Sequence, residues 1–253
     1  LGLGSEGVPF AGRLNLGSLK ITVARTLFNG LSLSKENGTI AVIWKGTSAD
    51  PIVAKKAIGN GQTLAASVTI ADSGAQNPQE TDPGVTGALL GDVTGDLSVE
   101  ASYTFSGTRR GINVASADDN AGLLVNTLES GKLTIKGLSG ISSAMGTPTV
   151  MTSAANKAAG GLIGCVGECA AVEVANALDI SGFTVKATGN EGAAGGFIGR
   201  ATKLALTFAD GGSVTPARTV GDANTTYAGG AIGDVSFAAD FVLTPGQIGF
   251  GDD

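Results

Sequence analysis

Histidine is absent from all 253 residues of this sequence. Without an imidazole the chain cannot build Ser-His-Asp or Cys-His catalysis, and the His-Glu-x-x-His zinc motif of metalloproteases is excluded as well. Aromatic side chains are also scarce, with one tryptophan and two tyrosines, so a stacking platform for sugars is hard to assemble. The net charge is −6 and the sequence pI is about 4.7. Because nucleic acid and anionic membrane surfaces select a basic face, we expect neither as a partner.

Long apolar runs are missing too. No segment approaches the roughly 18 consecutive apolar residues of a membrane helix, so we expect no membrane insertion. The chain begins with Leu1 and shows no signal peptide, which we interpret as a mature or excised piece of a larger polypeptide. Glycine is abundant, at 41 residues, but has no three-residue collagen period. An apolar content of 42 % is too high for a disordered chain and indicates a packed core.

Cysteine occurs only twice, as Cys165 and Cys169 in "CVGEC". This spacing matches neither the redox nor the zinc Cys-x-x-Cys pattern. A disulfide between the two would indicate an oxidising compartment. Residues four apart on an extended strand are about 13 Å apart, whereas a disulfide needs Cα atoms within about 7 Å. The disulfide therefore requires a turn, which Gly167 would allow; the alternative is two free thiols, one of them buried.

A short motif of glycine and apolar residues recurs along the chain, and internal repeats of this length identify solenoids, propellers or helical arrays. The intervals between its anchor glycines are 35, 39, 35 and 34 residues. The last three units close with a further glycine, at Gly164, Gly199 and Gly233. The five anchors are Gly87 in "GALLGD", Gly122 in "AGLLVN", Gly161 in "GGLIGC", Gly196 in "GGFIGR" and Gly230 in "GGAIGD".

Alternating apolar residues follow each anchor, as in "AVEVANALDISGFTV" after Gly161. Alternation over four to six residues is typical of a β-strand, and no 3.6-residue helical period accompanies it. We therefore predict an all-β fold, a right-handed parallel β-helix (β-solenoid) with coils of about 35 residues. Like strands should stack about 4.8 Å apart, which predicts one ladder of Ile163, Ile198 and Ile232.

The repeated glycines have a structural explanation in such a fold. Glycine reaches positive φ at sharp corners without steric strain, and it lets the backbones of neighbouring coils approach closely. A phosphate-binding loop is the functional alternative, but no Gly-x-x-x-x-Gly-Lys-Ser/Thr or Gly-x-Gly-x-x-Gly opens a helix here. We expect no cofactor and no metal, since the acidic stretch "GDVTGD" matches neither the EF-hand spacing nor the calcium-binding nonapeptide repeat.

The regularity of the repeat suggests how the chain is organised. We expect a single elongated solenoid over residues 1–253, with irregular coils or a cap over 1–80 and regular coils over 81–253. The first part contains strand-like runs at 39–44 and 67–71. An irregular terminal coil is typical of solenoids, because it must hide an open apolar end.

The unit "AAGGLIGCVGECAAVEVANALDISGFTV" resembles the GLUG-type repeat of bacterial secreted and surface proteins, and the resemblance covers about residues 87–240. It implies an extracellular right-handed β-solenoid that serves as a stalk or binding surface in adhesin-like proteins. The second unit departs from the pattern at Ala121 and Val125, where glycines are expected.

Our leading hypothesis is a non-catalytic extracellular segment of a larger bacterial surface protein, structural or adhesive, exposed at the cell surface or secreted. Its partner would be a host or cell-surface ligand, either protein or glycan. The candidate binding loops are residues 74–84, 107–121, 142–159 and 186–195.

Two alternatives remain open. A polysaccharide-degrading or tailspike-like β-helix would need paired carboxylates, for which Asp118 with Asp119 and Asp92 with Asp96 are the candidates. A self-assembling surface-layer or filament subunit would instead bury a large contact between copies.

Overall fold

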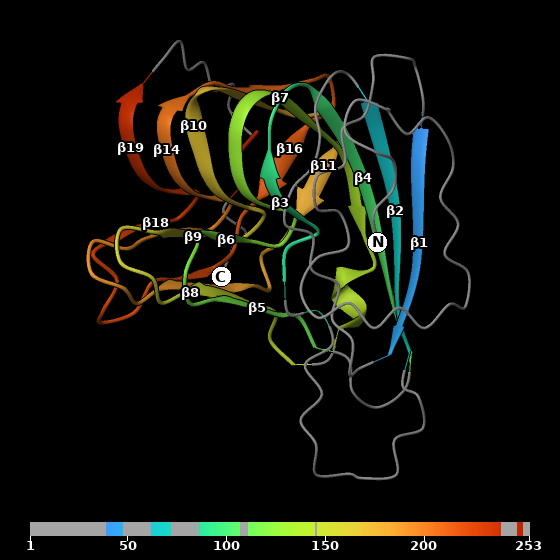
Figure 1. Cartoon of the computed structure of the whole chain (residues 1–253), viewed down its shortest axis with the longest axis horizontal. Coiled ribbons are helices and arrows are strands. Elements are labelled where there is room, and N and C mark those ends of the chain that lie inside the picture. Colours follow the sequence, from blue (N-terminus) through green and yellow to red (C-terminus); the bar gives the residue numbers. More distant parts are fainter. Residues whose placement is uncertain are drawn as a thin grey trace, which may run out of the picture.

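A computed structural model of the chain describes residues 39–47, 62–71, 85, 87–106, 111–144, 146–238 and 247–249. Within this part of the chain the regular structure is β-strand, apart from the three-residue 3₁₀ helix η1 (Ile141–Ser143). Every strand pairing described is parallel. The predicted all-β, parallel solenoid is therefore confirmed (Figure 1).

The strands form four sheets, of which the largest has nine strands and is called the large sheet. Its members are β1 (Thr39–Thr47), β2 (Gln62–Ala71), β3 (Leu90–Val93), β4 (Leu97–Ser106), β7 (Val125–Ser139), β10 (Ile163–Val174), β14 (Ile198–Leu204), β15 (Leu206–Phe208) and β19 (Ile232–Ala238).

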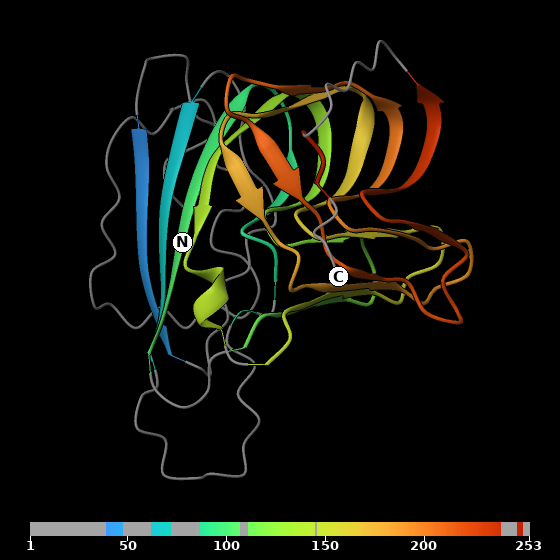
Figure 2. The same ribbon diagram turned by 180° about the vertical axis from the view of Figure 1, so that it is seen from behind.

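Three smaller sheets complete the coils. The outer sheet contains β5 (Asn113–Ser116), β8 (Thr149–Thr152), β12 (Thr184–Ala187) and β17 (Thr219–Val220). The inner sheet contains β6 (Ala121–Gly122), β9 (Ala158–Gly160), β13 (Ala193–Gly195) and β18 (Tyr227–Gly229). The short sheet pairs β11 (Ala177–Asp179) with β16 (Ser213–Thr215), and both are clearest in Figure 2.

One coil passes through the four sheets in a fixed order, as β8, β9, β10 and β11 illustrate. The inner sheet contacts both the outer sheet and the large sheet, so it forms a middle layer between them. Its strands β9 and β13 are fully buried and contain only alanine and glycine. Small residues therefore occupy the layer where two other sheets approach from opposite sides.

The predicted isoleucine ladder is present. Ile163 pairs in register with Ile198, and Ile198 pairs with Ile232. Val125 and Leu90 extend the same ladder toward the N-terminus. All but Ile232 are completely buried, so equivalent side chains stack coil upon coil in one continuous core.

The register corrects the sequence alignment of the second unit. Gly122 pairs with Gly160 rather than with Gly161, so the second interval is 38 residues instead of 39. The predicted departures at Ala121 and Val125 are wrong, because these residues face Ala159 and Ile163 as ordinary members of the repeat. The real departures are one residue further on, where Leu123 stacks beside Gly161 and Asn126 beside Gly164.

Each coil turns from the inner sheet into the large sheet at a corner in which backbone packs directly on backbone. A Cβ added to Gly160 would lie 1.9 Å from the carbonyl oxygen of Ile163 in the same coil and 2.5 Å from the nitrogen of Gly199 in the next. A Cβ on Gly196 would lie 2.0 Å from the carbonyl oxygen of Gly230. Real Cβ atoms do not tolerate such distances, so the predicted close approach of neighbouring coils is confirmed.

The other predicted role of the repeated glycines, to reach positive φ at sharp corners, is wrong. None of Gly122, Gly161, Gly164, Gly196, Gly199 and Gly233 has positive φ. The positive-φ glycines of the described residues lie elsewhere, at Gly95, Gly131, Gly140, Gly146, Gly211 and Gly221. The corner glycines are required for space and not for a left-handed backbone.

The two strands that precede the regular repeats belong to the same large sheet. β1 pairs with β2, β2 with β4, and β4 with the C-terminal half of β7. The predicted runs at 39–44 and 67–71 thus lie within β1 and β2. Most of the remaining residues of the 1–80 segment lie outside the described part of the chain.

A Gly196→Ala substitution tests the corner. We expect it to lower the free energy of unfolding by about 3 kcal/mol or more, because the new methyl group meets a backbone carbonyl that cannot move aside. Gly182→Ala is the matched control, since no atom lies within 4 Å of its added Cβ. It should leave stability unchanged or raise it by about 0.4–1 kcal/mol. Equal effects in denaturant-unfolding curves would contradict the role assigned to the corner.

Candidate functional site

Loops of successive coils stack at the edge of the solenoid where the outer sheet turns into the inner sheet. They comprise residues 117–120, 153–157, 188–192 and 221–226. Parts of three predicted binding loops, 107–121, 142–159 and 186–195, therefore lie at this loop edge (Figure 1). The fourth predicted loop, 74–84, lies outside the described residues.

Hydrogen bonds between coils fix the first of these loops. The buried Thr152 hydroxyl donates to the carbonyl oxygen of Asp119 at 2.7 Å. The Asn120 side chain accepts from the backbone N–H of Ala158 at 2.8 Å and donates to the Thr127 hydroxyl at 3.0 Å. Because both buried polar side chains are satisfied, the loop is held as a defined part of the rod.

Arg200 joins the loops of two coils. Its guanidinium donates to the carbonyl oxygens of Asn156 at 3.0 Å and Glu191 at 2.8 Å, and it pairs with the Asp234 carboxylate at 2.9 Å. Asn156 and Glu191 have φ of 59° and 55°, and they are the non-glycine residues with positive φ in the described part of the chain. The planar fork of arginine thus stabilises two turns whose backbone conformation is unfavourable for these residue types.

A polar row runs along the large sheet. It consists of the residue that follows the closing glycine in the last three repeat units, together with the matching residue of the second unit. Cys165 pairs in register with Thr127 on one side and with Arg200 on the other, and Arg200 pairs with Asp234. Lys157 lies close by and forms an ion pair with Asp119 at 3.2 Å. Both ion pairs link adjacent coils, so charge complementarity reinforces the stacking.

The two cysteines lie on one strand, β10, and both are free. The turn that a disulfide between Cys165 and Cys169 would require is not formed. Instead the strand continues through a β-bulge between Val166 and Cys169. Gly167 does not form the predicted turn but allows the close approach of the neighbouring strand, because an added Cβ would lie 2.6 Å from the carbonyl oxygen of Glu129.

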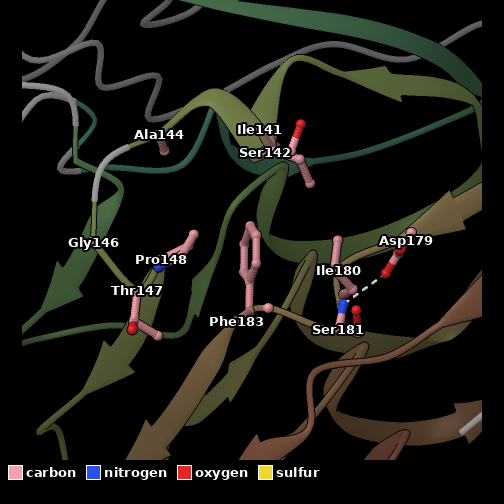
Figure 3. Close-up of a pocket in the computed structure, with 11 residues that line it drawn as sticks. Ile141, Ser142, Ala144, Gly146, Thr147, Pro148, Asp179, Ile180, Ser181 and Phe183 are labelled. Atoms are coloured by element: carbon pink, nitrogen blue, oxygen red, sulfur yellow. Dashed lines mark hydrogen bonds between the residues drawn. The ribbon is translucent and has the colours of Figure 1, made fainter. Parts of the chain in front are cut away.

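A cleft of about 310 Å³ lies between segments of two successive coils. One wall is η1 with residues 144 and 146–148, and the other is the turn at residues 179–183. Ile141, Ile180 and Phe183 supply its apolar floor, and all three are buried. Figure 3 shows the Phe183 ring standing between Pro148 and Ile180. Residues from two successive coils thus form one concave surface.

The polar side of the cleft is formed by Asp179 and Ser181 (Figure 3). The Asp179 carboxylate accepts the backbone N–H of Ser181 at 2.9 Å. This hydrogen bond, together with one from the Ser181 side chain, lowers the pKa of Asp179 below its ordinary value. The cleft therefore presents an ionised carboxylate, a hydroxyl and an apolar floor to one small group.

One member of each acidic pair proposed for hydrolysis, Asp119 and Asp96, has other contacts. Asp119 binds Lys157 and the N–H of Asn120, and Asp96 accepts the backbone N–H of Lys132 at 2.8 Å. Asp118 is exposed.

The described residues include no group of three His, Cys, Asp or Glu side chains that could hold a metal ion. No helix in the same residues is long and apolar enough to cross a membrane.

The chain was compared with protein-family models, with curated proteins and with solved structures. None of the three comparisons finds a match. Inferences about function therefore rest on the geometry of the solenoid and on the sequence.

Arg200→Lys tests whether the arginine fork holds the loop edge. A lysine keeps the charge but cannot reach two carbonyls and a carboxylate in one plane, so we expect a loss of about 1–3 kcal/mol. Amide exchange should accelerate in 153–157 and 188–192. Lys203→Ala, an exposed change on the same strand, is the control. Unchanged exchange in both loops would contradict the clamp.

Thiol alkylation tests the placement of the cysteines. Burial raises the pKa of Cys165, with Arg200 and Lys157 opposing the shift, whereas Cys169 is exposed. Because the thiolate is the nucleophile, iodoacetamide at neutral pH should modify Cys169 first and Cys165 much more slowly. Peptide mass spectrometry of Cys165→Ser and Cys169→Ser variants assigns the rates. Faster labelling of Cys165, or a mass showing a Cys165–Cys169 disulfide, would overturn this arrangement.

Proposed function

We propose that the chain is a non-catalytic, extracellular segment of a larger bacterial surface protein, and that it presents a ligand-binding surface on a rigid solenoid. The observation that carries the proposal is the cleft built by two successive coils on a continuously hydrogen-bonded scaffold. Binding residues on loops are effective when a rigid framework positions them. The resemblance of the repeat to the GLUG type supports an extracellular, adhesin-like role.

The scaffold supports the binding surface through contacts between coils. The four ion pairs of the described residues each join side chains about one coil apart, such as Lys186 with Asp222. The stacked turns of the loop edge are fixed by Arg200 and by Thr152. A surface held in this way loses little conformational freedom when it binds, which favours affinity.

The chemistry of the cleft favours the end of a glycan as ligand. The Asp179 carboxylate is an acceptor for sugar hydroxyls, and Ser181 supplies a hydroxyl that can donate or accept. The floor around Phe183 is almost completely buried, so it adds only a small apolar contact for the C–H groups of a sugar. The small volume fits one or two sugar units, with the rest of the glycan outside.

Gly182→Trp tests the proposal on a panel of surface glycans. The glycine lines the cleft and has open space at its Cβ, so the indole should fill the cleft without disturbing the fold. We expect wild type to bind a subset of the panel and the variant to lose at least tenfold in affinity. Thr207→Trp, on an exposed strand position away from the cleft, should bind like wild type.

Two results would contradict the proposal. Equal binding by wild type and Gly182→Trp would remove the cleft from the binding surface. Polysaccharide turnover that is lost in Asp118→Asn and Asp119→Asn variants would instead identify a β-helix enzyme.

A further inference from the structure

The loop at residues 221–226 carries a sequence pattern that the neighbouring loops of the loop edge lack. It contains Asn224-Thr225-Thr226, which is the Asn-x-Thr acceptor pattern for N-linked glycans. Asn156 and Asn190 lie in the loops of the two preceding coils, but the residue two positions further on is alanine or glycine there. The pattern requires a hydroxyl group at that position. Asn224 is therefore the acceptor that these three loops offer.

The acceptor loop is accessible from solvent. Asp222, Asn224 and Thr226 are all exposed. Asn156 and Asn190 in the loops of the inner coils are exposed as well, so the accessibility comes from the loop edge and not from the place of this coil in the chain. The loop is also one residue longer than the corresponding loop of either preceding coil, which gives a modifying enzyme more chain to engage.

Hydrogen bonds hold this loop in one turn, and they do not involve the group that would react. The Asp222 carboxylate accepts the backbone N–H of Asn224 at 2.9 Å, and the Thr225 hydroxyl accepts the backbone N–H of Asp222 at 3.1 Å. The backbone N–H of Thr225 donates to the carbonyl oxygen of Asp222 at 3.1 Å. The side-chain amide of Asn224 has no hydrogen-bond partner among the described residues. A defined turn thus presents an unpaired amide to solvent.

The two Asn-x-Thr patterns of the chain differ in the charge that precedes them. Asp222 lies two positions before Asn224, whereas Lys35 lies two positions before Asn37. A carboxylate at this position can pair with a lysine or arginine of a transferase, which would repel a lysine. The Lys186 ammonium lies 3.8 Å from the Asp222 carboxylate, a weak surface pair that an incoming cation can replace. Asn224 therefore has a recognition charge that Asn37 lacks.

We propose that Asn224 is a site of N-linked glycosylation, and that the oligosaccharyltransferase recognises Asp222 and the Thr226 hydroxyl. The side-chain nitrogen of Asn224 forms a bond to the anomeric carbon of a lipid-pyrophosphate-linked oligosaccharide. The bond from that carbon to the pyrophosphate oxygen breaks, and the lipid pyrophosphate leaves with the electron pair. A base of the transferase takes the proton that the amide loses.

This modification rests on the extracellular location proposed above, because N-linked glycans are added to exported chains. It does not use the cleft, which is lined by η1 and the turn at residues 179–183. The glycan is bulky and hydrophilic, so it covers the tip of the loop edge. The loop edge and the cleft thus have separate roles and can be tested separately.

The experiment incubates the folded full chain with a purified bacterial oligosaccharyltransferase and a lipid-pyrophosphate-linked oligosaccharide. Peptide mass spectrometry should find one glycan per chain, on Asn224 and not on Asn37. We expect no transfer to the Asn224→Gln and Thr226→Val chains, and transfer at least tenfold slower to Asp222→Asn. Thr226→Ser keeps the hydroxyl group and should remain an acceptor.

Thr225→Ala separates recognition from the shape of the turn. It removes the hydroxyl that accepts the Asp222 N–H but keeps the Asn-x-Thr pattern, so transfer should be as fast as to wild type or faster. A synthetic peptide of residues 219–229 is the unfolded control. Transfer to the peptide but not to the folded chain would overturn the proposal, and so would transfer to neither.

Two further results would contradict it. Modification of Asn37 without modification of Asn224 would assign the acceptor elsewhere, and equal rates for wild type and Asp222→Asn would remove the role of the carboxylate. Glycan-panel binding by the unmodified chain is a separate readout. A failure of transfer therefore does not affect the proposal for the cleft, and a failure of panel binding does not affect the assignment of Asn224.

Discussion

The fold depends on backbone-to-backbone contact at the corner of each coil. At the last inner-sheet residue of these coils there is no room for a Cβ, since a Cβ on Gly160 or Gly195 would lie 1.9 Å from a carbonyl oxygen of its own coil. Neighbouring coils meet at the same place, where a Cβ on Gly161 or Gly196 would reach the next coil. This contact fixes the position of each coil on its neighbour. The apolar ladders, the polar row and the stacked loops all inherit their register from it.

The strand content and the isoleucine ladder could be predicted because an alternating pattern and a fixed period are both readable in the sequence. The register of the second unit could not, since it has one glycine where later units have two, and an alignment on glycine alone is ambiguous by one residue. Hydrogen bonding resolves this by pairing Gly122 with Gly160. A sequence also cannot distinguish a glycine needed for positive φ from one needed for space. The bulge between Val166 and Cys169 left no readable signal, because Gly167 suited a turn equally well.

The loop edge and the cleft differ in how far the sequence reveals them. The polar row has a signal, because Arg200 and Asp234 each directly follow the closing glycine of their units. The cleft has none. It arises where the chain between Ile135 and Thr149 is four residues longer than the chain between their stacked partners Val174 and Thr184. Such an insertion forms η1 and interrupts the period. A prediction based on the repeat period treats this insertion as a loop, although the insertion creates the concave surface on which the proposed function rests.

Methyl-resolved NMR tests the central claim most directly. With isoleucine δ1-methyl groups labelled in an otherwise deuterated chain, parallel in-register stacking about 4.8 Å per coil predicts nuclear Overhauser contacts between Ile163 and Ile198 and between Ile198 and Ile232. The contact between Ile163 and Ile232, two coils apart, should be much weaker. A Gly196→Ala chain that remains soluble should lose the Ile198–Ile232 contact first. Absence of nuclear Overhauser contacts among the methyl groups of these three isoleucines in the native chain would contradict the stacked-coil structure and the role of the glycine corner within it.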